Sequence, residues 1–249
     1  MNHSISMLLN HLPEITFHTR VRDASIPGDN PFRWQDKSTT EIFAGKRSIL
    51  FSLPAAFSPT CTDHHVPRYE DLADQFKALG IDQIVCVAVN DAFVMFQWGK
   101  KVGVNQIHLL PDGNAEFTRR MGMLIDRSAF GMGMRSWRYS LLLNGVEIEK
   151  AFVEQGIDAP NPDDPLKVSD ADTMMKHLQS LSWAATCGQQ GARQAEHHWP
   201  TVIKSSTALK RGGMRWITAR SNIKLVVDNS KERLGPTECV IHTSMIHEN

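Results

Sequence analysis

A single cysteine in a proline-flanked loop carries the clearest chemistry in this sequence. Cys61 ends the stretch 54–61 (PAAFSPTC), which follows an apolar run over residues 48–53 and precedes an amphipathic segment over residues 66–79. A cysteine at a strand-to-helix junction lies beside unpaired backbone N–H groups and the positive end of the helix dipole, and both favour the thiolate. The alternative is a small buried apolar cysteine, which is the commoner role of this residue. The prolines and the position at the loop exit favour a reactive sulfur.

The segments around Cys61 predict strands that alternate with helices. Apolar or alternating runs bounded by turn residues predict the strands, and Asn144-Gly145 is a strong hairpin signal. Apolar residues at helical spacing predict the helices, one of which begins after Asn90-Asp91. The predicted strands cover residues 15–20, 48–53, 84–89, 108–110, 137–143 and 146–153, and the first helices cover about 66–79 and 90–98. This order predicts an α/β fold with a mixed sheet and helices on both faces.

The last predicted helix closes this domain. It begins after Ser169-Asp170, and one face of it carries Met174, Met175, Leu178 and Leu181. The character of the sequence changes near residue 182, after which only residues 223–227 resemble a strand. We therefore predict a domain boundary at about residue 182.

Composition and charge exclude several classes of function. The chain has 249 residues and a formal net charge of zero, which gives no reason to expect nucleic acid or an anionic membrane as a partner. No apolar stretch reaches the roughly 18–20 residues that span a bilayer. Residues 1–12 lack the basic region of a secretory signal, so we expect a cytoplasmic protein.

The cysteines and histidines do not predict a disulfide framework or a metal site. Four cysteines in a chain of this size (Cys61, Cys86, Cys187 and Cys239) are too few for a disulfide scaffold. The spacing of Cys61, His64 and His65 fits no common zinc pattern. We expect neither a metal nor another cofactor.

Several stretches in the same order resemble one known family. Residues from about 12 to 181 closely resemble the type II, or peroxiredoxin 5, subfamily of the peroxiredoxins. The matching stretches are residues 17–23, 30–34, 54–68, 87–91, 110–113, 135–140 and 167–173. The resemblance implies a thioredoxin-like mixed sheet flanked by helices over residues 12–182, with residues 183–249 as an unmatched C-terminal extension. It also implies thiol-dependent reduction of hydrogen peroxide and organic hydroperoxides.

The resemblance assigns roles to particular residues. The active-site pattern of the family, Pro, three residues, Thr or Ser, two residues, Cys, falls on Pro54, Ser58 and Cys61. The catalytic arginine of the family falls on Arg138, and His65 and Thr60 are expected to support the site. Thr is commoner than Ser at the middle position, and Gly is commoner than Ala after the proline. We expect activity to be retained, because Ser58 keeps the hydroxyl.

Peroxide attack converts Cys61 to a sulfenic acid, which another thiol must resolve. Cys86 lies 25 residues further on, and plant members of the subfamily use this spacing for a second redox cysteine. The alternative role for Cys86 is a core cysteine in the strand at 84–89. Some animal relatives carry a resolving cysteine in the segment corresponding to residues 154–166, which has none here. The remaining route is attack by glutathione, glutaredoxin or thioredoxin on the sulfenic acid.

Relatives of this type differ in their C-terminal segments and in their assembly. Some bacterial relatives carry a C-terminal glutaredoxin domain, but no Cys-Pro-x-Cys motif occurs after residue 182 here. The sequence is compatible with three explanations of residues 183–249: disorder, a divergent extension, or a shifted reading frame. The relatives dimerise through faces near the active site, so we expect a homodimer. The alternative function is a non-catalytic redox sensor or interaction protein with a thioredoxin fold.

Overall fold

The structure, a computed structural model, describes residues 10–159 and 163–183 and three short strands between residues 207 and 226. The chain divides into two compact units, residues 1–179 and 180–249. The division lies close to the boundary expected from the sequence.

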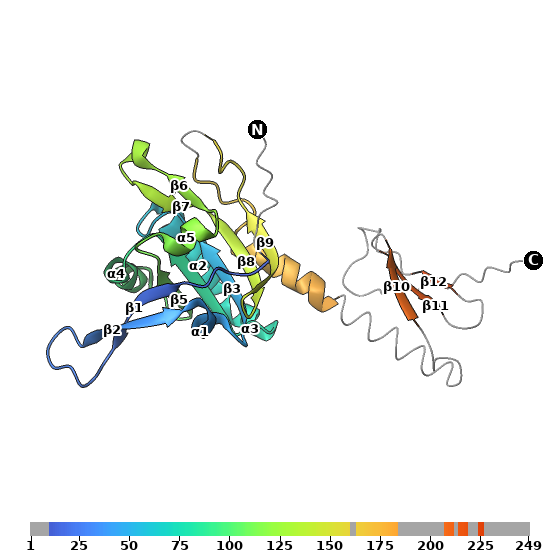
Figure 1. The fold of residues 1–249 in the computed structure, drawn as a ribbon, viewed down its shortest axis with the longest axis horizontal. Coiled ribbons are helices and arrows are strands. Elements are labelled where there is room, and N and C mark those ends of the chain that lie inside the picture. Colours follow the sequence, from blue (N-terminus) through green and yellow to red (C-terminus); the bar gives the residue numbers. More distant parts are fainter. Residues whose placement is uncertain (1–9, 160–162, 184–206, 212–213, 219–223, 227–249) are drawn as a thin grey trace, which may run out of the picture. The chain divides into compact units, whose positions relative to one another are not determined.

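A five-stranded mixed sheet forms the centre of the first unit (Figure 1). The strand order is β5-β4-β3-β8-β9, in which β3, β4 and β5 are parallel and β8 and β9 are antiparallel additions. The bounds are β3 Arg47–Ser52, β4 Gln83–Ala88, β5 Ile107–Pro111, β8 Tyr139–Asn144 and β9 Glu147–Val153. The inner strands are continuous apolar runs because both faces of the sheet are covered. This mixed sheet confirms the predicted fold class.

Helices and a hairpin cover the two faces of the sheet. The helices are α1 Thr39–Phe43, α2 Val66–Asp71, α3 Ala73–Ala78, α4 Ala92–Val102, α5 Glu116–Arg120 and a further helix over residues 171–183. Neighbouring residues of β3 face opposite sides: Phe51 packs with Tyr69 of α2 and Trp98 of α4, whereas Leu50 packs with Phe117 of α5. The two hydrophobic cores of the unit therefore lie on either side of one sheet.

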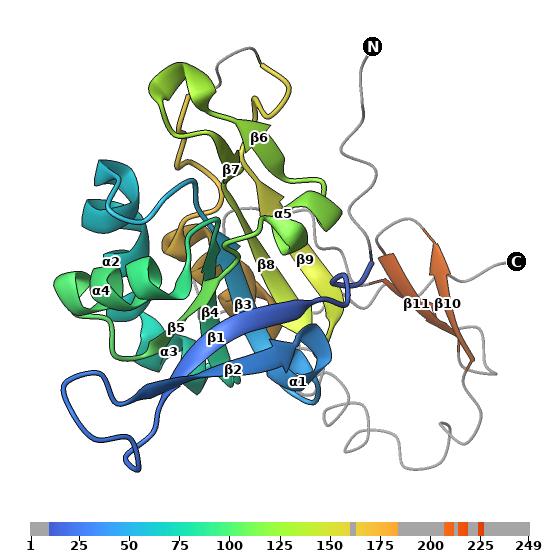
Figure 2. The same cartoon turned by 60° about the vertical axis from the view of Figure 1, so that its left-hand side comes forward.

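Two smaller hairpins complete the first unit. Strands β1 Thr16–Arg22 and β2 Phe32–Ser38 pair antiparallel, and Figure 2 shows them crossing one face of the central sheet. Strands β6 Leu124–Asp126 and β7 Met134–Ser136 form the other hairpin, with the short helix η2 Ser128–Phe130 between them. Strand β7 leads into β8, so this hairpin stands directly before the residue that the sequence analysis assigned as the catalytic arginine.

The helix predicted over residues 66–79 is interrupted. Helices α2 and α3 are separated at Leu72, whose φ of −93° and ψ of 0° leave the helical region. The turn before them, Cys61–His65, is a π-helix (η1). The apolar spacing predicted the buried face correctly, but spacing alone does not detect a local change of helical pitch. On the last helix Met174, Met175 and Leu178 are buried, whereas Leu181 is exposed because it lies beyond the edge of the core.

The second unit contains a three-stranded antiparallel sheet. Its strands are β10 Thr207–Arg211, β11 Met214–Thr218 and β12 Lys224–Val226 in the order β10-β11-β12. The sequence analysis predicted a strand at residues 223–227 but did not predict β10 or β11. Cys187 and Cys239 lie outside the described residues. Among the residues that the structure does describe, no helix has the length and apolar character to cross a membrane.

Candidate active site

Cys61 lies at the first turn of the helical segment that comes after β3. Thr62 N donates to Ser58 O at 2.9 Å, and Val66 N donates to the carbonyl of Cys61, so the π-turn is formed over this residue. Trp98 Nε1 of α4 donates to Thr62 Oγ1 at 3.1 Å and fixes this turn against α4. Cys61 itself is fully buried. The placement at a strand-to-helix junction is as predicted, but the cysteine is more enclosed than a loop exit suggested.

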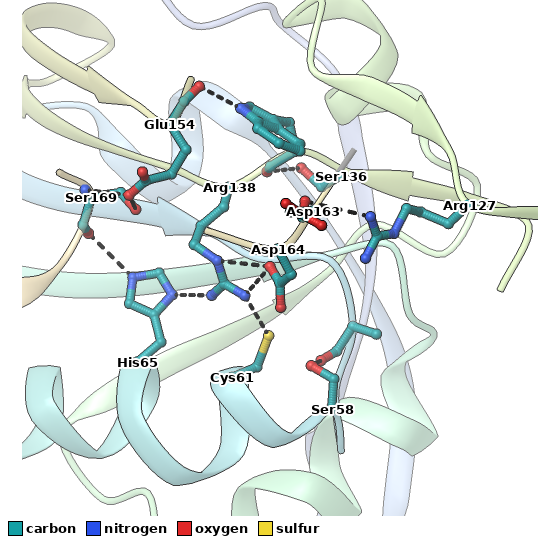
Figure 3. A network of polar contacts seen from close by, with 12 residues as sticks. Ser58, Cys61, His65, Arg127, Ser136, Arg138, Glu154, Asp163, Asp164 and Ser169 are labelled. Carbon is teal, nitrogen blue, oxygen red and sulfur yellow. Dashed lines mark hydrogen bonds and ion pairs between the residues drawn. The ribbon is translucent and has the colours of Figure 1, made fainter. Parts of the chain in front are cut away.

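The sheet brings Arg138 to Cys61. Ser52 at the end of β3 pairs with Tyr139 at the start of antiparallel β8, so Arg138 lies at the edge of the sheet from which the Cys61 loop emerges. Arg138 Nη2 donates to Cys61 Sγ at 3.3 Å, as Figure 3 shows. The Arg138 side chain has no exposed surface, so its charge acts on the sulfur in a medium of low dielectric constant. This contact places a buried positive charge directly beside the sulfur of Cys61.

His65 accepts a hydrogen bond from the guanidinium of Arg138. Arg138 Nη1 lies 2.8 Å from His65 Nδ1, and because an arginine carries only donors, Nδ1 accepts this bond. The proton of the neutral imidazole is therefore on Nε2, which donates to Ser169 O at 3.2 Å. Burial, and then the charge of Arg138, lower the pKa of His65 to about 3. His65 is thus a neutral acceptor at physiological pH, not a second cation.

A buried carboxylate fixes the loop on which His65 rests. Glu154 comes directly after β9, and its Oε1 accepts hydrogen bonds of 2.8 to 2.9 Å from the backbone amides of Lys167, Val168 and Ser169 and from Ser169 Oγ. Burial alone would raise the pKa of Glu154, but these donors outweigh burial and lower it. Glu154 N also donates to Arg138 O at 3.2 Å. Glu154 therefore binds the loop at 167–169 through its carboxylate and the strand end that carries Arg138 through its backbone amide.

Asp164 is a further partner of the arginine. Arg138 Nε donates to Asp164 Oδ1 at 3.1 Å, and Nη2 makes a shorter contact with the same oxygen. Nη2 is also the atom that contacts Cys61, so sulfur and carboxylate share one nitrogen (Figure 3). Burial alone would lower the pKa of Arg138, but the charges of Cys61 and Asp164 raise it. The guanidinium therefore stays protonated between two acceptors.

The remaining predicted residues line the loop before Cys61. Pro54 is buried and Thr60 is the N-cap of the π-turn, where its side chain makes no capping hydrogen bond. Ser58 Oγ donates to Ala55 O at 3.1 Å, so its hydrogen-bond donor is directed into its own loop. The structure brings His65 and Arg138 into one network with Cys61. The roles of Ser58, Thr60 and Pro54 toward a peroxide stay predictions.

Cys86 lies in β4, inside the core that also holds Cys61. Both cysteines are buried free thiols. Burial, and then the charge of Cys61, raise the pKa of Cys86 well above its ordinary value, which keeps this thiol protonated. Cys86 pairs in register with Phe51 of β3 and Leu109 of β5, so it is held in the middle of the sheet. Cys61 and Cys86 are not joined by a disulfide in this structure.

Two residues of this network, Glu154 and Asp164, are not predicted by any sequence pattern noted above. The position of Glu154 directly after a strand could have marked it, because an acidic residue there often binds a partner at the sheet edge. Its charge alone does not identify that partner. No local pattern distinguishes Asp164 from Asp163 beside it. Over the described residues no group of three or more His, Cys, Asp or Glu side chains is placed to hold a metal, and His64 is exposed.

Comparison with known proteins shows which family of proteins this chain is similar to. The Redoxin family profile matches residues 33–174. A relative from Synechocystis, peroxiredoxin sll1621, is 57% identical over 70% of this chain and 92% of its own length. The hybrid peroxiredoxin hyPrx5 of Haemophilus influenzae is 48% identical over 70% of this chain and 66% of its own length. The crystal structure of reduced Prx3 from Vibrio vulnificus in complex with H2O2 is 37% identical, with a TM-score of 0.56 over 68% of this chain and 93% of that one.

Proposed function

The chain belongs to the peroxiredoxin family of thiol peroxidases, and from this we propose that it reduces hydrogen peroxide and organic hydroperoxides at Cys61, with glutathione, glutaredoxin or thioredoxin as the reductant. The observation that carries the proposal is the 3.3 Å contact between Arg138 Nη2 and Cys61 Sγ. Only the thiolate is a good nucleophile, and a buried guanidinium lies in hydrogen-bond contact with the sulfur.

In the first step the Cys61 thiolate attacks the terminal oxygen of the hydroperoxide. An S–O bond forms, the O–O bond breaks, and its electron pair leaves on the second oxygen as an alkoxide or hydroxide. That oxygen takes up a proton and leaves as an alcohol or as water, while Cys61 becomes a sulfenic acid. Sulfur is oxidised and the peroxide is reduced.

Arg138 is proposed to accelerate this step by stabilising charge on the reacting oxygens. Its position is set before the peroxide arrives, because His65 and Asp164 hold the guanidinium from two sides. Pre-positioned donors of this kind contribute about 10²- to 10³-fold each to the rates of enzymes. Ser58 Oγ is a second proposed donor, which requires its hydroxyl to turn away from Ala55 O.

In the second step an external thiol is proposed to resolve the sulfenic acid. Glutathione attacks the sulfur of the Cys61 sulfenic acid, an S–S bond forms and water leaves. A second glutathione then attacks the glutathione sulfur of this mixed disulfide, which releases the Cys61 thiol and forms oxidised glutathione. The protonated, buried state of Cys86 supports this route over an internal disulfide. The hybrid relative from Haemophilus influenzae supports a glutathione-linked reductant, since bacterial hybrids of this type carry a glutaredoxin domain.

Assembly and location are two further parts of the proposal. A homodimer is supported by large exposed apolar side chains on the loop before Cys61 and on the β6–β7 hairpin, namely Phe57, Phe130 and Met134. A cytoplasmic location is supported by the free thiols of Cys61 and Cys86, because a sulfur that must be reduced in every cycle needs a reducing compartment.

Peroxide consumption by matched cysteine variants tests the proposal. The wild-type protein is mixed with hydrogen peroxide and with either glutathione plus glutaredoxin or thioredoxin plus its reductase. We expect multiple turnovers that Cys61→Ser abolishes and Cys86→Ser retains. Undiminished consumption by Cys61→Ser contradicts the assignment of the sulfur. A single oxidation without turnover, with a stable Cys61 adduct to a partner, supports the redox-sensor alternative instead.

A further inference from the structure

Asp164 is the residue of the arginine network that is exposed to solvent. Three side chains accept hydrogen bonds from Arg138 within the described part of the chain: Cys61, His65 and Asp164. Cys61 and His65 are buried, as is Arg138 itself, whereas the Asp164 side chain keeps 23% of its surface exposed. A molecule that approaches Arg138 from solvent therefore meets the carboxylate of Asp164 first.

The reacting oxygens of a peroxide must come close to this carboxylate. Arg138 has five N–H groups, and Asp164 accepts from Nε and Nη2 while Cys61 accepts from Nη2. An oxygen that is attacked by Sγ and stabilised by Nη2 lies next to the same nitrogen that binds Asp164 Oδ1. Figure 3 shows the sulfur and the carboxylate on one side of the guanidinium. The substituent of the peroxide then lies on the side of Asp164 and solvent.

A carboxylate in this position distinguishes substrates by charge. We propose that Asp164 makes the active site selective for uncharged hydroperoxides and disfavours those that carry a negative charge beside the O–O bond. The proposal rests on the proposed peroxidase function of Cys61. Two like charges about 4 Å apart repel by at least about 1 kcal/mol even in water, which is about fivefold in rate, and by more near a protein surface. Hydrogen peroxide and simple alkyl hydroperoxides are not subject to this repulsion.

The effect of Asp164 on selectivity can be separated from its effect on Arg138. Asp164 also shares the positive charge of the guanidinium with Cys61, so its removal alters the reactivity of the sulfur. That alteration affects every peroxide through the same attacking atom. This common effect on the sulfur cancels to first order in the ratio of the rate constants for an anionic and an uncharged peroxide. The ratio therefore reports the repulsion between Asp164 and the anionic substrate.

Stopped-flow kinetics of Cys61 oxidation by two peroxides test the proposal. Hydrogen peroxide is the uncharged substrate, and peroxymonosulfate, an anion at neutral pH, is the charged one. Asp164→Asn keeps the shape of the side chain and removes its charge, and Asp164→Ser removes the charge with a shorter side chain. We expect both variants to raise the ratio of the peroxymonosulfate to the hydrogen peroxide rate constant about fivefold or more at low salt. High salt should reduce this difference between variant and wild type.

Asp163→Asn is the matched control. Asp163 is the exposed neighbour of Asp164 and carries the same charge, but its side chain does not contact Arg138 in the structure. We expect this variant to change the ratio by less than about twofold, because an exposed charge at greater distance is largely screened. If the Asp164 variants change both rate constants by the same factor, Asp164 only positions Arg138 and the selectivity proposal is wrong. If wild-type Cys61 does not react with hydrogen peroxide at all, the proposed function and the selectivity are both wrong.

Discussion

His65 Nδ1 accepts a 2.8 Å hydrogen bond from Arg138 Nη1, which places a neutral imidazole directly against a buried guanidinium. Protonation of His65 would replace this bond by the contact of two cations. The far side of the ring is fixed as well, because Nε2 donates to Ser169 O. The charge state of one buried histidine is therefore coupled to the position of the arginine that contacts Cys61.

This coupling predicts a loss of stability in acid. The pKa of His65 is about 3 in the folded protein and about 6.5 when unfolded, so the unfolded state binds one more proton between these values. The stability that His65 contributes by staying neutral is complete above about pH 6.5 and falls as the pH drops toward 3, by about 1.4 kcal/mol per pH unit. We expect the free energy of unfolding in urea to fall more steeply with decreasing pH in the wild type than in His65→Gln. Parallel profiles would show that His65 does not stay neutral.

Replacement of Glu154 by glutamine tests the clamp on the loop at 167–169. The glutamine retains one oxygen but loses the negative charge to which four donors now bond. Because charged hydrogen bonds are worth about 1.5–3 kcal/mol each, we expect Glu154→Gln to lower the free energy of unfolding by about 2 kcal/mol or more. The exposed Glu147→Gln is the control and should lie within about 0.5 kcal/mol of the wild type.

The same variant is expected to slow peroxide reduction. The carbonyl of Ser169 holds His65, and His65 holds Arg138, so a displaced loop displaces the guanidinium. Activity of Glu154→Gln equal to that of the wild type, measured where both proteins are fully folded, would separate the clamp from catalysis.

The role of the Ser58 hydroxyl can be tested by removing it and by restricting its rotation. Ser58 Oγ now donates to Ala55 O, and the unbranched serine side chain does not restrict rotation about χ1. Threonine carries the hydroxyl on a branched side chain with a stiffer χ1 angle. We expect Ser58→Thr to oxidise about as fast as the wild type or up to about threefold faster, and Ser58→Ala to lose about 10²-fold in the rate constant for hydrogen peroxide. A Ser58→Ala variant as fast as the wild type would remove this hydroxyl from the mechanism.

The fate of Cys86 after oxidation decides how the enzyme is recycled. Cys86 is buried in the centre of the sheet, and its raised pKa leaves little thiolate at neutral pH. We therefore expect peptide mapping, after one equivalent of hydrogen peroxide in the presence of glutathione, to find a glutathione adduct on Cys61. Cys86→Ser should oxidise and recycle at the wild-type rate. A Cys61–Cys86 disulfide would instead show that Cys86 resolves the sulfenic acid.

Local sequence patterns predicted the positions of helices and strands better than the local geometry within them. A continuous apolar run predicted β3, a continuous β-branched run predicted β4, and the Asn144-Gly145 turn predicted the β8–β9 hairpin. The spacing of apolar residues predicted the buried face of α2 and α3 but not the π-turn or the interruption at Leu72. Hydrophobic spacing reports which side of a segment is buried, and it carries little information on helical pitch.

The amino-acid sequence alone was enough to place Cys61 between a buried strand and the start of a helix, because both elements have local apolar patterns. The family pattern also pointed to Arg138 and His65. The presence of Glu154 and Asp164 in the same network became visible only in the folded chain, since strand pairing between β3, β8 and β9 brings these distant segments to one edge of the sheet. The partner of a charged side chain depends on which chain ends the sheet brings together, and this information is absent from any local stretch of residues.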